Sequence, residues 1–221
     1  LHLEIRTEAM KDYATTYWPS SNDKDVDWVK EHYHSPTLFI AEHKECPSPK
    51  TMDCLVVACK EEMEIHVVKK GEIISTYPIS VGQSPKGHKQ EQGDNKTPED
   101  AYRLIQKSRG PFSGDMASFF GEAWIRISYP NTFDATAGLE DARINQSEYA
   151  KIASANKAGK EPPKHTKLGG GIGIHGWSGD WSLEGNRAIT WGCISIRNND
   201  LVKFYDQVPI DTEIYILPHN K

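Results

Sequence analysis

Apolar and polar positions alternate through much of the chain from residue 54 onward, and this pattern predicts a mostly β domain. The first alternating stretches cover residues 55–58, 64–68 and 73–79, with a Lys-Lys-Gly-Glu turn at 69–72. Such spacing is typical of a β-hairpin that opens a sheet. Further strands are expected at 101–105, 123–127, 172–175, 194–196 and 212–217.

Two segments show helical patterns instead. Residues 201–208 carry apolar side chains at helical spacing after an Asn-Asn-Asp cap cluster, which predicts a short helix packed behind the sheet. Residues 139–157 are rich in Ala, Glu, Gln, Lys and Arg, which predicts an exposed helix. That helix belongs to an insertion around residues 134–168, which is either a lid over a neighbouring strand or a decoration of the fold.

The first 52 residues differ in pattern from the remainder. Helical spacing at 6–17 and 25–33 and a strand pattern at 36–41 precede a Cys-Pro-Ser-Pro loop at 46–49. We therefore expect a partly helical N-terminal extension over 1–52, followed by a mostly β domain over 53–221.

Length and charge set the frame for this domain. A chain of 221 residues can bury one sizeable core and carry an extension. Its 26 basic and 31 acidic residues give a net charge of −5, which argues against nucleic acid or an anionic membrane surface as the partner. No apolar run approaches the roughly 20 residues of a membrane span. The chain begins with Leu1, so removal of an export signal is expected.

Three of the four cysteines lie close together in the sequence. In an oxidising compartment Cys46 can pair with Cys54 or Cys59; alternatively, all three are reduced. The fourth cysteine, Cys193, stands apart.

The candidate chemistry lies in residues 169–200. A glycine-rich apolar run ends at His175, and fourteen residues later comes the turn Thr190-Trp191-Gly192-Cys193. If strands 172–175 and 194–196 are neighbours, an imidazole meets a thiol, which needs such a base to act as a nucleophile. The backbone N–H groups of Trp191, Gly192 and Cys193 then form a candidate oxyanion hole. The alternative is a buried cysteine and a core histidine.

This pattern resembles the signature of the L,D-transpeptidase catalytic domain (YkuD family): His, 14 to 17 residues, Ser/Thr, His, Gly, Cys. Two further blocks support the resemblance. Residues 87–99 are similar to the GHK..EGD.KTPEG segment of one Gram-negative branch, and residues 127–131 to its ISYPN segment. Trp191 stands where many members carry His, Ser195 where many carry Arg, and Asp100 replaces a Gly.

The resemblance implies a mixed β-sandwich with short helices and a cysteine acyl-transfer reaction on peptidoglycan tetrapeptide stems in the periplasm or cell envelope. Cys193 is the implied nucleophile and His175 the base, with the backbone carbonyl of Gly176 orienting the imidazole. D-alanine leaves. The acyl group passes to a neighbouring stem in a 3→3 cross-link, to a lipoprotein or a D-amino acid, or to water in an L,D-carboxypeptidase or amidase. An inactive peptidoglycan-binding module is the alternative from another class.

Substrate contacts are expected from residues around this motif and in the two supporting blocks. Arginines in particular bind carboxylates with two parallel hydrogen bonds, although a solvated arginine is the simpler reading. The candidates are His88, Lys89, Tyr129, Trp177, Arg187, Thr190 and Arg197. Neither a metal nor an organic cofactor is expected for the reaction.

Overall fold

A computed structural model of the protein describes residues 5–6, 33–34, 53–114, 117–177, 185 and 187–219. The chain divides into two compact units, Leu1–Ser48 and Pro49–Lys221. In the first unit, β1 (Ile5–Arg6) pairs antiparallel with β2 (Tyr33–His34). The helices expected at 6–17 and 25–33 and the strand expected at 36–41 fall almost entirely outside the described residues.

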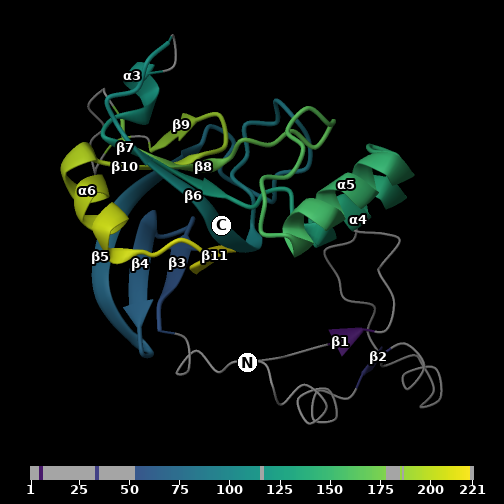
Figure 1. Cartoon of the computed structure of the whole chain (residues 1–221). Coiled ribbons are helices and arrows are strands. Elements are labelled where there is room, and N and C mark those ends of the chain that lie inside the picture. The colour runs from purple at the N-terminus through teal and green to yellow at the C-terminus, as the bar shows by residue number, and fades with distance from the viewer. Residues whose placement is uncertain are drawn as a thin grey trace. The chain divides into compact units, whose positions relative to one another are not determined.

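The second unit is mostly β, as the alternating pattern predicts (Figure 1). Its described strands are β3 (Leu55–Cys59), β4 (Glu64–Lys69), β5 (Glu72–Gly82), β6 (Asp100–Arg109), β7 (Ala123–Ile127), β8 (Gly173–His175), β9 (Ala188–Thr190), β10 (Ile194–Ile196) and β11 (Glu213–Leu217). They form one mixed sheet in the order β10-β8-β7-β6-β11-β3-β4-β5-β9. Because β10 also pairs with β5, the sheet closes on itself.

The long strand β5 makes this closure possible. Residues 72–78 pair with β4, Ile79 and Ser80 pair with β10, and the last two residues pair with β9. The first part of β5 is largely exposed, whereas its last four residues are buried. One strand therefore joins the opening hairpin to the strands that carry the histidine and cysteine motif.

The described helices pack in two places. They are α3 (Ala117–Phe120), α4 (Thr132–Glu140), α5 (Gln146–Lys157) and α6 (Asn198–Gln207). Helix α6 contacts β7 and buries Leu201 and Phe204 in the main core (Figure 1). None of the helices in the described residues combines the length and apolar character needed to cross a bilayer.

The insertion contains two helices where the sequence pattern predicted one. Asn131 and Asn145 each cap a helix reciprocally with the acidic residue three positions later. A first helix, α4, therefore ends and a second helix, α5, begins after Asn145. A separate small core holds the pair together. It consists of Ala135, Ile144, Ile152 and Leu168.

The two expected disulfide partners of Cys46 carry free thiols. Both Cys54 and Cys59 are unpaired, and Cys46 itself lies outside the described residues. Neither of the bridges considered from the sequence is therefore formed in this structure.

A fully buried lysine ties the end of β3 to the loop of residues 83–99. Lys60 Nζ donates hydrogen bonds to the carbonyls of Gly87 (2.9 Å) and Thr97 (3.1 Å) and to the Glu99 carboxylate (2.8 Å). Burial lowers the pKa of Lys60, and the Glu99 carboxylate opposes that effect. The loop is thus anchored from inside the protein.

Replacing Lys60 with Met is expected to lower the free energy of unfolding by about 3–5 kcal/mol, because Glu99 and two carbonyls lose their buried partner. Urea denaturation measures the change. Lys151→Met on the exposed surface of α5 is the matched control, with an expected change within about 0.5 kcal/mol. Equal stability of the two variants would contradict the anchoring role.

Candidate active site

Neighbouring strands place His175 and Cys193 on the same face of the sheet. β8 and β10 run parallel, with Ile174 opposite Ile194 and His175 opposite Ser195. Side chains alternate along a strand, so the two isoleucines enter the core while His175, Ser195 and Cys193 face the other way. The sequence prediction that these two strands are neighbours is confirmed.

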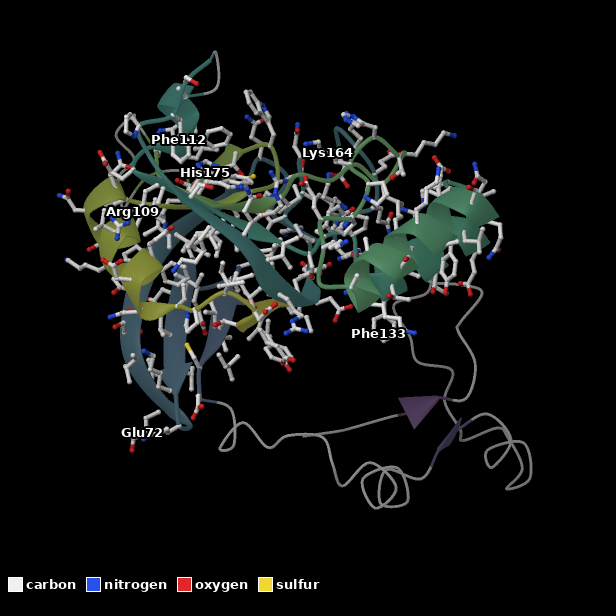
Figure 2. The ribbon with its side chains drawn as sticks, viewed as in Figure 1. Glu72, Arg109, Phe112, Phe133, Lys164 and His175 are labelled. Atoms are coloured by element: carbon white, nitrogen blue, oxygen red, sulfur yellow. The ribbon has the colours of Figure 1, made fainter. Side chains whose placement is uncertain are left out.

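His175 and Cys193 both line a cavity of 610 Å³. The other lining residues are Gln83, Phe112, Phe120, Trp124, Arg126, Lys164, Gly170, Gly171, Ile172, Trp177, Ile189, Thr190 and Trp191. Figure 2 shows Phe112 and His175 on the α3 side of the sheet and Lys164 on the connection that follows α5. Thiol and imidazole therefore share one open site.

The imidazole of His175 is held in one orientation. Its Nδ1 lies 2.5 Å from the carbonyl oxygen of Gly176, and a carbonyl only accepts, so Nδ1 carries the proton and Nε2 is the basic nitrogen. Ser195 Oγ donates to the same carbonyl at 3.2 Å. The ring stacks on Trp124 and meets the edge of Phe120, with ring centroids 6.0 Å apart in both cases.

Gly176 is fixed in turn by a side chain that sequence reasoning assigned only to a helix cap. Its N–H donates to the Phe120 carbonyl at 2.9 Å, and a Cβ at this position would lie 1.9 Å from Asn198 Oδ1. Asn198 Nδ2 donates to the carbonyl of Trp177 at 3.1 Å. The first residue of α6 therefore packs against the loop that orients the histidine, and only glycine fits at 176.

The turn before the cysteine also depends on a glycine. Gly192 has φ +125°, and a Cβ there would meet the Lys96 carbonyl at 2.7 Å. Thr190 Oγ1 donates to the Cys193 carbonyl (2.6 Å) and accepts from the Gly192 N–H (3.2 Å). This N–H is engaged inside the turn, and the oxyanion role predicted for Trp191, Gly192 and Cys193 stays a prediction.

Burial raises the pKa of the Cys193 thiol to about 11. A hydrogen bond from the Gly173 backbone and the positive charges of Arg126 and Lys89 oppose this shift but do not cancel it. At neutral pH the sulfur is therefore protonated, and it requires a base beside it at the moment of attack. Nε2 of His175, the ring nitrogen that the Gly176 carbonyl does not hold, is the candidate base in this cavity.

Two predicted substrate residues, His88 and Lys89, hold the 83–99 loop together and do not line the cavity. Lys89 is 4% exposed, and its Nζ donates to Asp94 (2.7 Å) and to the Glu91 carbonyl (2.8 Å). His88 Nδ1 accepts from the Glu99 N–H, and its Nε2 lies 2.9 Å from Asp134.

The same loop supports the cysteine turn through its backbone. Burial alone would raise the pKa of Asp94, but hydrogen bonds from Lys89 and from three backbone N–H groups outweigh it and hold that pKa below its ordinary value. Thr97 Oγ1 accepts from the Gly82 N–H at 2.9 Å, while the Lys96 carbonyl lies under Gly192. The block that resembles a family motif thus makes contacts within the protein, and the substrate role expected of His88 and Lys89 stays a prediction.

The remaining predicted substrate residues divide into two groups. Trp177 and Thr190 line the cavity. The other three do not: the buried Tyr129 hydroxyl donates to the Leu168 carbonyl (3.0 Å), Arg187 donates to the Met63 carbonyl (3.0 Å), and Arg197 is the exposed residue that precedes α6.

Two cavity cations were missed by the sequence reasoning. Arg126 and Lys164 both line the cavity and share Glu161, at 2.9 Å and 3.6 Å respectively. The Arg126 guanidinium also lies 5.2 Å from the Trp124 ring centroid. In the sequence, Arg126 is the one charged residue of the otherwise apolar strand 123–127, and this position could have marked it as a candidate site residue.

The raised pKa predicts how fast Cys193 reacts with iodoacetamide. The thiolate fraction grows roughly tenfold per pH unit below a pKa near 11, so the alkylation rate should rise in the same way between about pH 7 and pH 10. Peptide mapping by mass spectrometry separates Cys193 from Cys54 and Cys59. A rate already at its plateau near pH 7 would instead indicate a preformed thiolate and imidazolium pair.

Solved structures with the same fold come from bacterial proteins. Bdellovibrio bacteriovorus Bd1075 is 23% identical, with a TM-score of 0.50 and coverage of 76% of this chain and 48% of that chain. The helical cell shape determining protein Pgp2 from Campylobacter jejuni is 24% identical, with a TM-score of 0.50 and coverage of 76% and 49%. The chain thus spans about half the length of these proteins. A search of curated protein sequences found no match.

The match to a family model covers most of the second unit. Residues 55–216 match the model of the L,D-transpeptidase catalytic domain, YkuD. This range runs from the first residue of β3 to the last strand and includes both His175 and Cys193. The chain therefore belongs to the L,D-transpeptidase catalytic domain family.

Proposed function

We propose that the protein is a cysteine acyltransferase that acts on tetrapeptide stems of peptidoglycan in the periplasm or cell envelope. The observation that carries this proposal is the His175 imidazole, whose Nδ1 is held by the Gly176 carbonyl, in one cavity with the Cys193 thiol. Membership of the L,D-transpeptidase family supports the substrate class.

The first half-reaction forms a thioester. His175 Nε2 accepts the thiol proton while the sulfur attacks the carbonyl of the third stem residue at its L-centre. The backbone N–H groups of Trp191 and Cys193 are the proposed donors to the oxyanion. The imidazolium then protonates the departing nitrogen, and D-alanine leaves. Acid–base catalysis of this kind typically contributes about 10²–10⁴-fold.

The second half-reaction transfers the acyl group. An amine attacks the thioester, His175 removes its proton, and the Cys193 sulfur leaves and is reprotonated. An amine of a neighbouring stem yields a 3→3 cross-link, and a lipoprotein lysine or a D-amino acid yields an attached acceptor. Attack by water yields a tripeptide, which is the product of an L,D-carboxypeptidase. Hydrolysis of other peptide bonds by the same route would make the enzyme an amidase.

The cavity supplies charge and apolar surface suited to a stem peptide. Arg126 and Lys164 bring positive charge toward the carboxylates of the donor, while Trp177 and Trp191 offer flat apolar contact. Trp191 is 58% exposed, so its ring is accessible to a bound ligand. Pgp2 is a cell shape determining protein, and a role of this chain in cell wall biogenesis and cell shape is part of the proposal.

The protein should release D-alanine from purified tetrapeptide-rich muropeptides, and Cys193→Ala should abolish every product because it removes the nucleophile. Liquid chromatography with mass spectrometry identifies the outcome. Cross-linked dimers mean transfer to a stem, and tripeptides mean hydrolysis. Cys54→Ser is the matched control and should keep wild-type activity. Binding without any product would show an inactive module, and turnover by Cys193→Ala would refute the mechanism.

Lys164→Met should raise KM for muropeptides roughly fivefold, since an exposed charge contact contributes about 1 kcal/mol and 1.4 kcal/mol is tenfold. The value of kcat should change little, because this side chain does not take part in proton transfer. Steady-state kinetics of D-alanine release measures both constants, with Lys151→Met as the control. An unchanged KM would remove Lys164 from substrate binding.

A further inference from the structure

The first hairpin carries a cluster of potential metal-binding side chains on the face turned away from the main core. Along β3 and β4, Val56, Ala58, Ile65 and Val67 are buried in the core. Alternation therefore places Cys59 and His66 on the opposite face. Neither residue belongs to the cavity of the proposed acyl transfer.

Three potential metal ligands meet on this outer face. One ligand atom each from Cys59, Glu62 and His66 (a thiol sulfur, a carboxylate oxygen and a ring nitrogen) lie within 4.8 Å of one another. Cys59 ends β3, His66 lies in β4, and Glu62 is an exposed residue of the turn between them. The hairpin alone therefore brings the three groups together.

A fourth residue orients the histidine. His66 lies opposite Thr76 in β5, and its Nδ1 is 2.9 Å from Thr76 Oγ1. With Nδ1 engaged by the hydroxyl, Nε2 is the nitrogen left to bind a metal. Metal-binding histidines commonly have their second nitrogen fixed by a hydrogen bond in this way.

The donor set is of the kind that zinc prefers. Sulfur, imidazole nitrogen and carboxylate oxygen are its usual ligands, and in a tetrahedral site they lie about 3.3–3.6 Å apart. Closing the cluster from 4.8 Å to that spacing requires a movement of roughly 1 Å. Glu62 can supply this movement, because its side chain is exposed and belongs to a turn. A water molecule would complete the tetrahedron.

The local charge also suits a divalent cation. The Glu62 side chain is hydrogen-bonded to the Cys59 thiol, and the charge of Glu64 acts on the same sulfur. A divalent cation would be attracted by these carboxylates. On binding, a sulfur–metal bond replaces the S–H bond and the proton passes to solvent.

We propose that Cys59, Glu62 and His66 form a binding site for a divalent transition metal of the zinc class. The site would brace the β3–β4 hairpin. The sequence analysis expected no metal for the reaction, and the proposed site takes no part in it. Its test is therefore independent of the proposed acyl transfer.

The test is a titration of the reduced 221-residue protein with cobalt(II) chloride. Bound cobalt should give a thiolate-to-metal absorption band at one equivalent, and added zinc chloride should displace it. Cys59→Ser should abolish the band, and the matched control Cys54→Ser should keep it. Cobalt binding without a thiolate band, or a band that survives Cys59→Ser, would overturn the proposal.

Glu62→Gln provides a variant that leaves the buried side chains in place. It should fold as the wild type does and bind cobalt at least about tenfold more weakly, because one ligand loses its charge. Lys70→Gln, at an exposed position of the next turn, is the control for a surface change. An unchanged affinity in Glu62→Gln would show that the three residues do not bind metal together.

Discussion

The structure depends on one carbonyl group that accepts two hydrogen bonds. The Gly176 oxygen receives the Nδ1–H of His175 and the hydroxyl of Ser195, which lie opposite each other on parallel strands. The first bond fixes the tautomer of the imidazole and leaves its other nitrogen basic. The second comes from Ser195 on the neighbouring strand, so a short hydroxyl supports the same loop.

Every element around this carbonyl restricts its position. Phe120 and Asn198, from two segments distant in the sequence, contact Gly176, and the closed sheet keeps β8 and β10 side by side. Lys60 anchors the 83–99 loop, whose backbone supports the Gly192 turn. A thiol thus lines the same cavity as an imidazole whose orientation a backbone carbonyl already fixes, which limits the reorganisation required before the reaction.

Alternation and turn residues were enough to predict the β domain, its hairpin and the neighbouring strands that bring His175 and Cys193 together. Local signals did not predict which side chains the tertiary structure would bury. Lys89 and His88 were predicted as substrate contacts, but Lys89 is buried against Asp94 and the half-buried His88 binds Asp134. The sequence predicted a cap at residues 198–200, but Arg197 is the N-cap and no side chain caps the helix; the Asn198 side chain packs against Gly176 instead, a contact that arises only when distant segments pack.

Cavity residues were hard to predict for the same reason. Arg126 lies in a strand whose other residues are apolar, and Lys164 in a proline-rich return. Only the closed sheet and the insertion bring both residues to Glu161 and to the cavity that Cys193 lines. The start of α5 was hard to predict as well. It depends on the capping pair of Asn145 and Glu148, and amino-acid composition alone does not distinguish two capped helices from one continuous helix.

Intact-mass spectrometry of the acyl-enzyme tests the central claim most directly. The wild-type protein mixed with a tetrapeptide stem should gain the mass of the stem without its terminal D-alanine, and mapping should locate the adduct on Cys193. His175→Gln should form the same adduct about 10²–10⁴-fold more slowly. An adduct on another residue, or one formed by His175→Gln at the wild-type rate, would contradict the account.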